Sequence, residues 1–281
     1  MINILFCGNE AVFDGMLTCT LSILKRSLLD EPFTFYVFTM DVSHIKDTYV
    51  PISHTHMDFF NSVIKKYSPK SNAILIDVTD IYMKEFSNCP NENAYCSPYT
   101  LIRLFADLVK GMPDKVLYLD ADVLFNRDIN LLYSTSIDGY EYAAACDHYG
   151  KYLVKSDYIN AGVLLLNLKE IKKTGLFQKA RTLIKAKKLP FADQSAIIRS
   201  TTKKKLLSQK FNEQRFLKKS TVIRHFSKRL FWLPYPHTGN IKQWHVSDVH
   251  RVLKYYEFDD ILFEYIYLKN KFDNEVLKNE H

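Results

Sequence analysis

Two aspartates, Asp120 and Asp122, are the strongest candidates for chemistry in this chain. The four residues before them, 116–119, are apolar without polar alternation, which predicts a strand buried on both faces. Because side chains on a strand repeat every two residues, both carboxylates should leave the strand end on the same side. Two adjacent carboxylates at the edge of an apolar core are costly to desolvate, and a divalent cation such as Mg²⁺ or Mn²⁺ offsets that cost. An ordinary polar turn after a strand is the alternative that the spacing leaves open.

Length and composition limit the class of protein. The chain has 281 residues, of which 47% are hydrophobic and 25% charged, so it can bury a large α/β core and is not disordered. Its five cysteines are odd in number and form no CxxC pair, which indicates reduced thiols in a cytoplasmic protein. We expect no signal peptide and no membrane-spanning segment, because no long apolar run is present.

Charge is distributed unevenly along the chain. Residues 169–254 contain 22 lysines and arginines against four acidic residues, whereas the remainder contains 16 basic and 27 acidic residues. Such a split indicates a surface for phosphates, nucleic acid or an anionic membrane, although a solvated lysine-rich face has the same composition. No helix-turn-helix, RRM or zinc-finger pattern is present, so we expect no nucleic-acid partner. The composition leaves open whether the protein makes peripheral contact with the inner face of a membrane.

Strand and helix patterns alternate along the chain. Apolar runs predict strands at 3–7, 33–40, 73–78, 115–120, 142–147, 158–168 and 222–226. Helix-compatible spacing covers 12–29, 57–67, 100–110, 168–189 and 247–271, and the lysines at 203–205 indicate a solvated segment. A strand, a turn containing Gly8 and a helix open the chain as in nucleotide-binding α/β proteins, but no GxGxxG motif supports a dinucleotide site. We see no domain linker and no internal repeat.

Five sequence blocks, in order, resemble glycosyltransferase family 8, which includes glycogenin and bacterial lipooligosaccharide galactosyltransferases. The blocks are Arg103 before the predicted strand, the DxD element at 118–122, the segment 158–168, the pair Asp193-Gln194, and Gly239-x-x-Lys242-x-Trp244. The match covers about residues 2–245. A DxD element alone is a weak signal, and the order of the five blocks makes the resemblance strong.

The resemblance implies both a fold and an activity. It implies a single Rossmann-like nucleotide-diphospho-sugar transferase domain of the GT-A type at 1–245, followed by a C-terminal helical extension at 246–281. The central sheet should be mixed, mostly parallel and flanked by helices. The implied activity is a retaining, divalent-metal-dependent transfer of glucose or galactose from a UDP-sugar to a glycan, lipid-linked or glycoprotein acceptor. A catalytically silent sugar-nucleotide or glycan-binding module of the same fold is the alternative.

The resemblance also assigns site residues. Mn²⁺ or Mg²⁺ would be held by Asp120, Asp122 and a histidine. We favour His225 at a strand end, and His237 in a proline-flanked segment stays open as the alternative. The expected catalytic residues are Gln194, Asp193 and Lys242, with Gln194 as a neutral polar group near the anomeric carbon and Lys242 on the phosphates. The expected substrate contacts are Cys7, Gly8, Asn9, Phe13, Arg103, Ala121, Asn160, Ala161, Gly239 and Lys242, with Asp147 near the acceptor. Arg103 has a structural ion pair as its alternative role.

The ends of the chain raise two further questions. Where the family has an Asp-Asp-Asn-Tyr run, this chain has Gly8-Asn9-Glu10-Ala11, so we expect Asn9 to bind the uracil edge and Phe13 to replace the stacking aromatic ring. In the C-terminal stretch, aromatic residues alternate with Arg251, Lys254, Lys269 and Lys271. That pattern suits an anionic membrane surface, and packing of the tail onto the catalytic domain accounts for the aromatic residues equally well.

Overall fold

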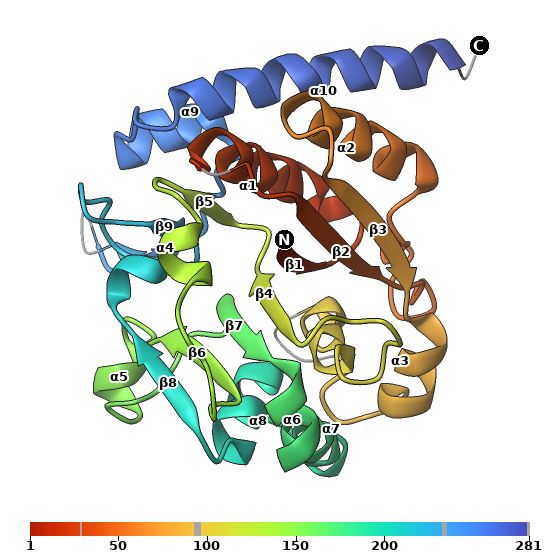
Figure 1. The fold of residues 1–281 in the computed structure, drawn as a ribbon, viewed down its shortest axis with the longest axis vertical. Helices are drawn as coiled ribbons and strands as arrows, with labels where there is room; N and C mark the ends of the chain where they lie inside the picture. Colours follow the sequence, from red (N-terminus) through yellow and green to blue (C-terminus); the bar gives the residue numbers. More distant parts are fainter. Residues whose placement is uncertain (29, 93–96, 232–234, 280–281) are drawn as a thin grey trace.

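A seven-stranded sheet forms the centre of the computed structural model, which describes residues 1–28, 30–92, 97–231 and 235–279 (Figure 1). In spatial order its strands are β3 (Asn72–Asp77), β2 (Phe33–Thr39), β1 (Ile2–Cys7), β4 (Lys115–Leu119), β7 (Val163–Asn167), β6 (Tyr142–Ala145) and β8 (Lys204–Leu207). All neighbouring pairs are parallel except those of β7, which runs antiparallel to both β4 and β6. The mixed, mostly parallel sheet expected from the sequence is therefore confirmed.

Strand β4 is buried on both faces, as its apolar run predicts. Leu117 and Leu119 belong to the hydrophobic core on one face of the sheet, and Val116 and Tyr118 belong to the core on the other. Each of these four side chains is at most 2% exposed. The strand therefore ends with two carboxylates at the boundary between a dry interior and the surface, which is where charge is costly.

Helices cover the two faces of the sheet (Figure 1). One face packs against α1 (Phe13–Arg26), α2 (His54–Tyr67) and α10 (Asp259–Asn279), and the other against α3 (Thr79–Phe86), α6 (Leu168–Thr174), α7 (Leu176–Ala186) and α8 (Ala192–Ser200). Short elements complete this part of the fold: η1 (Glu10–Val12), α4 (Asn130–Tyr133), α5 (Gly150–Leu153) and η4 (Gln209–Phe211). Within the described residues, no helix combines the length and apolar character needed to cross a bilayer.

The segment expected to be a helix at 100–110 differs from that prediction. It forms two short 3-10 helices, η2 (Pro98–Thr100) and η3 (Ile102–Phe105), followed by turns. The side chain of Arg103 donates from Nε to the carbonyl of Thr100 at 2.9 Å, and the backbone bonds of Leu104 and Ala106 span three residues instead of four. Burial of the Arg103 guanidinium thus decides the local backbone, which helical periodicity did not reveal.

Two segments differ from their predicted roles in strand pairing. The predicted strand at 222–226 is β9 (Ile223–His225), which is buried but pairs with β5 (Val123–Phe125) in a separate two-stranded sheet. The lysine run at 203–205 is not merely a solvated segment, because it enters the edge strand β8, whose partner is β6. A hairpin of β10 (Arg229–Phe231) and β11 (His237–Gly239) follows β9. Lysines suit an edge strand because their charge discourages further strand pairing.

The C-terminal helix is interrupted before it packs onto the domain. Instead of one helix from 247 to 271, the chain forms α9 (Val246–Asp248), the π-helix η5 (Val249–Leu253), a break at Lys254 with φ of 57°, and then α10. In Figure 1, α10 runs across α1 and α2. Phe258, directly before α10, and the inner-face residues Ile261, Leu262, Tyr265, Leu268 and Phe272 are buried in the same core as α1 and α2. Packing of the tail therefore accounts for these six apolar residues.

A carboxylate from α10 ties this helix to its two neighbours. Glu264 accepts hydrogen bonds from Lys25 of α1 at 2.7 Å, from Lys66 of α2 at 2.9 Å, and from the hydroxyl of Tyr67. Burial opposes ionisation of Glu264, but these three donors outweigh it and lower its pKa to about 2. Since that value lies below the ordinary 4.5, the carboxylate stabilises the fold above pH 4.5, and this contribution is lost as the pH falls through about 2.

Replacing Glu264 with Gln should lower the free energy of unfolding by about 1–2 kcal/mol near neutral pH, because two ammonium groups lose their anionic partner. Urea unfolding of both proteins from about pH 6 to about pH 3 measures this difference, which should shrink as the pH falls. Glu275→Gln is the matched control, because Glu275 lies on the same helix in an exposed pair with Lys271 at 3.7 Å. A loss of equal size at every pH would contradict the proposed ionic contribution.

Candidate active site

Asp120 and Asp122 lie in the turn between β4 and β5, and two strand pairings hold that turn in place. The amide of Asp120 donates to the carbonyl of Gly162 beside β7 at 2.8 Å, and the amide of Phe226 donates to the carbonyl of Asp122 at 2.8 Å. The second bond continues the β5–β9 pairing, in which Val123 lies opposite His225. Pairing β5 with β9 therefore brings a histidine that is far away in the sequence onto the two carboxylates.

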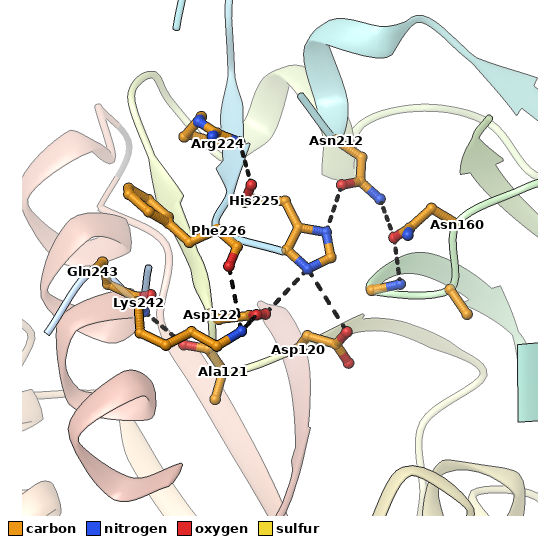
Figure 2. Close-up of polar contacts among 12 residues, drawn as sticks. Asp120, Ala121, Asp122, Asn160, Asn212, Arg224, His225, Phe226, Lys242 and Gln243 are labelled. Carbon is orange, nitrogen blue, oxygen red and sulfur yellow. Dashed lines mark hydrogen bonds and ion pairs between the residues drawn. The ribbon is translucent and has the colours of Figure 1, made fainter. Parts of the chain in front are cut away.

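The three side chains converge closely enough to share a cation (Figure 2). His225 Nε2 lies 3.1 Å from Asp122 Oδ1 and 3.9 Å from Asp120 Oδ2. One ligand atom from each residue lies within 4.8 Å of the others, a spacing that could hold a metal ion. His237 lies elsewhere, in the exposed strand β11, with Nδ1 facing the carbonyl of Tyr235 at 2.8 Å. The geometry thus supports His225 over His237 as the third ligand.

A chain of hydrogen bonds orients the His225 ring (Figure 2). The backbone amide of Gly162, which can only donate, binds Asn160 Oδ1 at 3.0 Å, and Asn212 Nδ2 donates to the same oxygen at 2.9 Å. Asn212 therefore turns its Oδ1 toward His225 Nδ1, 2.9 Å away. Because an amide oxygen accepts, His225 Nδ1 carries a proton, and Nε2 is the ring nitrogen that faces the carboxylates. Asn212 was missed by the sequence analysis, since it belongs to no recognised block.

Gly162 permits this close packing. A Cβ atom at this position would lie 2.4 Å from Cε1 of His225 and 2.8 Å from Oδ2 of Asp120. No side chain fits there without displacing both groups. The segment 158–168 contains this glycine, but its steric role follows from the approach of β9 and was not visible in the sequence.

The positively charged side chain of Lys242 lies against one of the two carboxylates. The ammonium of Lys242 contacts Asp122 Oδ2 and the carbonyl of Phe226, the latter at 3.3 Å (Figure 2). Burial opposes ionisation of Asp122, but His225 and Lys242 outweigh it and hold the pKa of this carboxyl far below its ordinary value. Asp122 is therefore ionised at neutral pH. Two carboxylates and an imidazole nitrogen form a ligand set that fits a divalent cation, and the Lys242 ammonium lies on the Asp122 oxygen that does not face His225.

Arg103 contacts the site from the buried side. Its side chain is 3% exposed, and its guanidinium lies 3.1 Å from Asp120, 3.2 Å from Asp193 and 2.6 Å from the carbonyl oxygen of Ala161. These contacts match the structural ion pair that the sequence left open for Arg103. Burial raises the pKa of Asp193, although Arg103 acts in the opposite direction. Gln194 accepts a hydrogen bond from the amide of Ala161 at 3.0 Å, so this residue also belongs to the same network.

A cavity of about 210 Å³ opens beside the two aspartates. Predicted contact residues that line it are Cys7, Gly8, Asn9, Arg103, Ala121 and Lys242, and the aromatic residues Tyr99 and Trp244 join them. Asn160 and Asp147 instead line a second cavity, and Gly239 lies in strand β11. The cavity thus brings together the start of the chain, the DxD turn and the segment around Lys242.

Phe13 does not occupy the place expected for a stacking ring. It is 2% exposed, and its ring packs against His56, Phe60 and Phe272 in the core between α1, α2 and α10. The prediction that Phe13 replaces the stacking aromatic residue is therefore wrong, because helix α1 turns this side chain into the interior. The aromatic residues that line the cavity are Tyr99, Tyr118 and Trp244.

Comparison with known sequences identifies the family. A model described as Glycosyl transferase family 8 matches residues 3–247. The chain belongs to glycosyl transferase family 8. A candidate glycosyltransferase of Haemophilus influenzae is 27% identical over 191 residues, which cover 64% of this chain and 52% of that protein. Glycosyltransferase GlyA of Streptococcus pneumoniae is 31% identical over 132 residues, which cover 44% of this chain and 18% of GlyA. The match thus spans about half of the first relative's length and less of the second.

Solved structures of glycosyltransferases share the fold. The galactosyltransferase LgtC, solved with donor and acceptor sugar analogs, has a TM-score of 0.64 at 18% identity, covering 94% of this chain and 96% of LgtC. GlyE of Streptococcus pneumoniae has a TM-score of 0.61 at 20% identity, covering 98% of this chain and 64% of GlyE. The expected GT-A fold is confirmed by this likeness.

Replacing Asn212 with Ala should weaken Mn²⁺ binding by about 10- to 100-fold, because His225 loses the acceptor that fixes its tautomer and ring orientation. Isothermal titration with Mn²⁺ alone measures the effect. Lys210→Ala is the matched control, since Lys210 is exposed in the same short helix and its ammonium lies over the Phe211 ring. If Asn212→Ala binds Mn²⁺ as tightly as Lys210→Ala does, the orienting role is wrong.

Proposed function

We propose that this family 8 glycosyltransferase is a retaining, divalent-metal-dependent hexosyltransferase. It moves glucose or galactose from a UDP-sugar to a glycan, lipid-linked or glycoprotein acceptor. The observation that carries the proposal is the convergence of Asp120, Asp122 and His225 beside a cavity formed by the first strand and the DxD turn. The shared fold with LgtC, which was solved with donor and acceptor sugar analogs, supports a sugar-nucleotide site at this place.

Each residue of the cluster has a role in this proposal. Asp120, Asp122 and His225 hold Mn²⁺ or Mg²⁺, which when bound supplies Lewis-acid charge for the diphosphate leaving group. Lys242, which pairs with Asp122, contributes a further positive charge at this site. This charge stabilises the diphosphate, whose negative charge grows as the glycosidic bond breaks. Arg103 keeps Asp120 in place by a charge-assisted hydrogen bond and Asp193 by an ion pair. The chain thus surrounds the leaving group with fixed positive charge.

Gln194 is the proposed neutral group near the anomeric carbon. Its side-chain oxygen accepts a hydrogen bond from the amide of Ala161. The next residue, Gly162, accepts one from the amide of Asp120. A solved active-site mutant of LgtC replaces a glutamine by glutamate, which supports a catalytic glutamine in this fold. Asp193 is bound to buried Arg103, so it does not serve as a free nucleophile. We therefore favour stabilisation of an oxocarbenium-like centre over a two-carboxylate double displacement.

A screen of UDP-glucose and UDP-galactose with Mn²⁺, scored by UDP release, tests the proposal. We expect release from one of these donors, and a loss of at least about 100-fold in Asp122→Asn and His225→Ala, because each removes a metal ligand. His237→Ala is the matched control and should retain activity, since His237 lies in the exposed hairpin.

The outcomes separate the alternatives. UDP binding without release from either donor would support the catalytically silent module. Full activity in EDTA or in Asp122→Asn would contradict the metal assignment. A greater loss of UDP release in His237→Ala than in His225→Ala would indicate that His237 is the third metal ligand.

Contact with an anionic membrane is a further part of the proposal, through the outer face of α10. Phe263 and Tyr267 of this helix are 56% and 64% exposed. The basic residues nearby are partly neutralised, because Arg251 pairs with Asp248, Lys269 with Asp273 and Lys271 with Glu275. Membrane contact would therefore depend on the exposed aromatic rings as well as on the basic surface at 169–254.

Vesicle co-sedimentation measures this contact. The protein should bind anionic but not neutral vesicles at low salt, and high salt should release it, because screening weakens exposed charge pairs. The double variant Phe263→Ser, Tyr267→Ser should bind several-fold more weakly. Met83→Ser, which alters an exposed apolar residue on α3, is the matched control. If the protein stays in the supernatant at low salt, α10 has a packing role alone.

A further inference from the structure

A second cavity, of about 540 Å³, has a wall that is linked by hydrogen bonds to the residues around the proposed metal site. Asn160 belongs to that wall: its Oδ1 takes part in the chain that orients His225, and its Nδ2 donates to Asp147 Oδ2 at 3.0 Å. Both Asn160 and Asp147 line the second cavity. A molecule bound there would therefore lie beside the residues that position the donor, where an acceptor must bind.

Positive charge predominates around this cavity. Among the described residues that line it, Arg215, Lys228 and Arg229 are basic, and Asp147 is the one carboxylate. That carboxylate is already satisfied, since it accepts from the amides of Tyr149 and Gly150 as well as from Asn160. The charges of Arg215 and Arg229 thus outnumber the negative charge in the lining of this cavity.

The two arginines are held on aromatic rings. In the part of the chain that the structure describes, the Arg215 guanidinium lies 4.9 Å from the centre of the Phe216 ring, and that of Arg229 lies 5.0 Å from the Phe231 ring. Arg229 Nε is buried and has no hydrogen-bond partner among the described residues. A guanidinium stacked on a ring keeps its N–H edge free for a carboxylate or phosphate.

The neighbouring titratable groups agree with a positive environment. The pKa of His148 is held below its ordinary value by burial first, and also by the charges of Arg215 and Lys151. Glu213, the nearby acid, is buried and accepts from the backbone amides of Arg215 and Phe216. Its negative charge is thus partly satisfied by backbone donors.

A buried donor without an acceptor gives an independent sign of a ligand. Gln214 lines the cavity and is 7% exposed. Its Oε1 accepts from the amide of His148 at 2.9 Å, which fixes the orientation of the side-chain amide. Its Nε2 is buried and, among the described residues, has no hydrogen-bond partner. Leaving such a group unsatisfied is unfavourable, and a ligand oxygen would remove the deficit.

Apolar surfaces complete the cavity. Tyr149 and Phe191, which are 38% and 47% exposed, contribute aromatic rings to its lining. Aromatic rings offer flat apolar surfaces that match the apolar face of a sugar ring, while a few polar groups fix its orientation. The cavity therefore combines features for a sugar ring with features for an anion.

We propose that this cavity binds the acceptor, and that the acceptor is a saccharide that carries an oxyanion group, either a carboxylate or a phosphate. Arg215 and Arg229 bind the oxyanion, Gln214 Nε2 donates to an acceptor oxygen, and Tyr149 or Phe191 contacts the ring. This inference rests on the proposed function, because it names the substrate class of the same enzyme.

Three sugars with the same ring distinguish the sources of the charge: glucose, glucuronate and glucose 6-phosphate. Ligand-observed NMR titrations of the wild-type protein should show binding of glucuronate or glucose 6-phosphate about tenfold tighter than that of glucose, since charge-assisted hydrogen bonds exceed neutral ones. The preferred anion identifies carboxylate or phosphate as the group recognised. The double variant Arg215→Gln, Arg229→Gln should abolish the preference.

Two further variants test whether the preference for anionic sugars arises in the second cavity. Gln214→Glu keeps the shape of the side chain but adds negative charge, and should weaken binding of the anions more than that of glucose. Lys242→Gln alters the first cavity, so it should leave the preference unchanged. Equal binding of all three sugars, no binding of any, or a preference that persists in the double variant would overturn the inference.

UDP release from UDP-glucose or UDP-galactose with Mn²⁺ keeps this test separate from that of the proposed function. Release without an anion preference refutes the acceptor inference alone. Anion preference without release from any donor refutes the transferase proposal, while the cavity remains an anionic-saccharide site.

Discussion

The cost of placing two carboxylates at the end of a fully buried strand is the constraint on which this structure depends. Charge at such a boundary is stable only where cations and donors replace the lost water. The chain supplies them from three directions: Arg103 and the Tyr118 hydroxyl bind Asp120, and His225 and Lys242 bind Asp122. Apart from Tyr118, which lies on β4 itself, these groups come from other segments of the chain, so the complete site exists only in the folded protein.

The reversed strand β7 explains how the second cavity comes to lie near the residues that orient the metal cluster. Because β7 runs antiparallel to β4, with Val163 opposite Leu119, the residues before β7 lie beside the residues after β4. The isolated bridge between Cys146 and Ile159 places the segment after β6 against the same stretch. Asn160 therefore stands between the metal cluster on one side and Asp147 on the other. A single amide side chain links the geometry of the proposed donor and acceptor sites.

Helix α10 illustrates how one element can be structural on one face and exposed on the other. Its buried face shares a core with α1 and α2, and Glu264 binds donors from both. Helix α1 in turn lies directly under the DxD turn, where Gly15 allows the carbonyl of Ala121 and the ring of Trp244 to approach closely. The position of the turn thus depends indirectly on the C-terminal helix.

Local patterns in the sequence were sufficient for strands β1 to β4, for helices α1 and α2, and for the two neighbouring carboxylates, but not for the edge strand β8 or for helix α3. Apolar runs and helical spacing are properties of short segments, so β1, β2, β3, β4 and α1 lie close to their predicted positions. The order of the family blocks was sufficient for the fold class, since the family model covers residues 3–247.

Contacts between distant residues decided the rest. The choice between His225 and His237 was open in the sequence, and the pairing of β9 with β5 places His225, not His237, on the carboxylates. The roles of Asn212 and Gly162 depend on the same approach of separate segments. Phe13 was assigned wrongly because a sequence pattern does not show which way a helix turns a ring. Strand pairing and side-chain direction are set by tertiary packing, which has no signature within a short stretch of sequence.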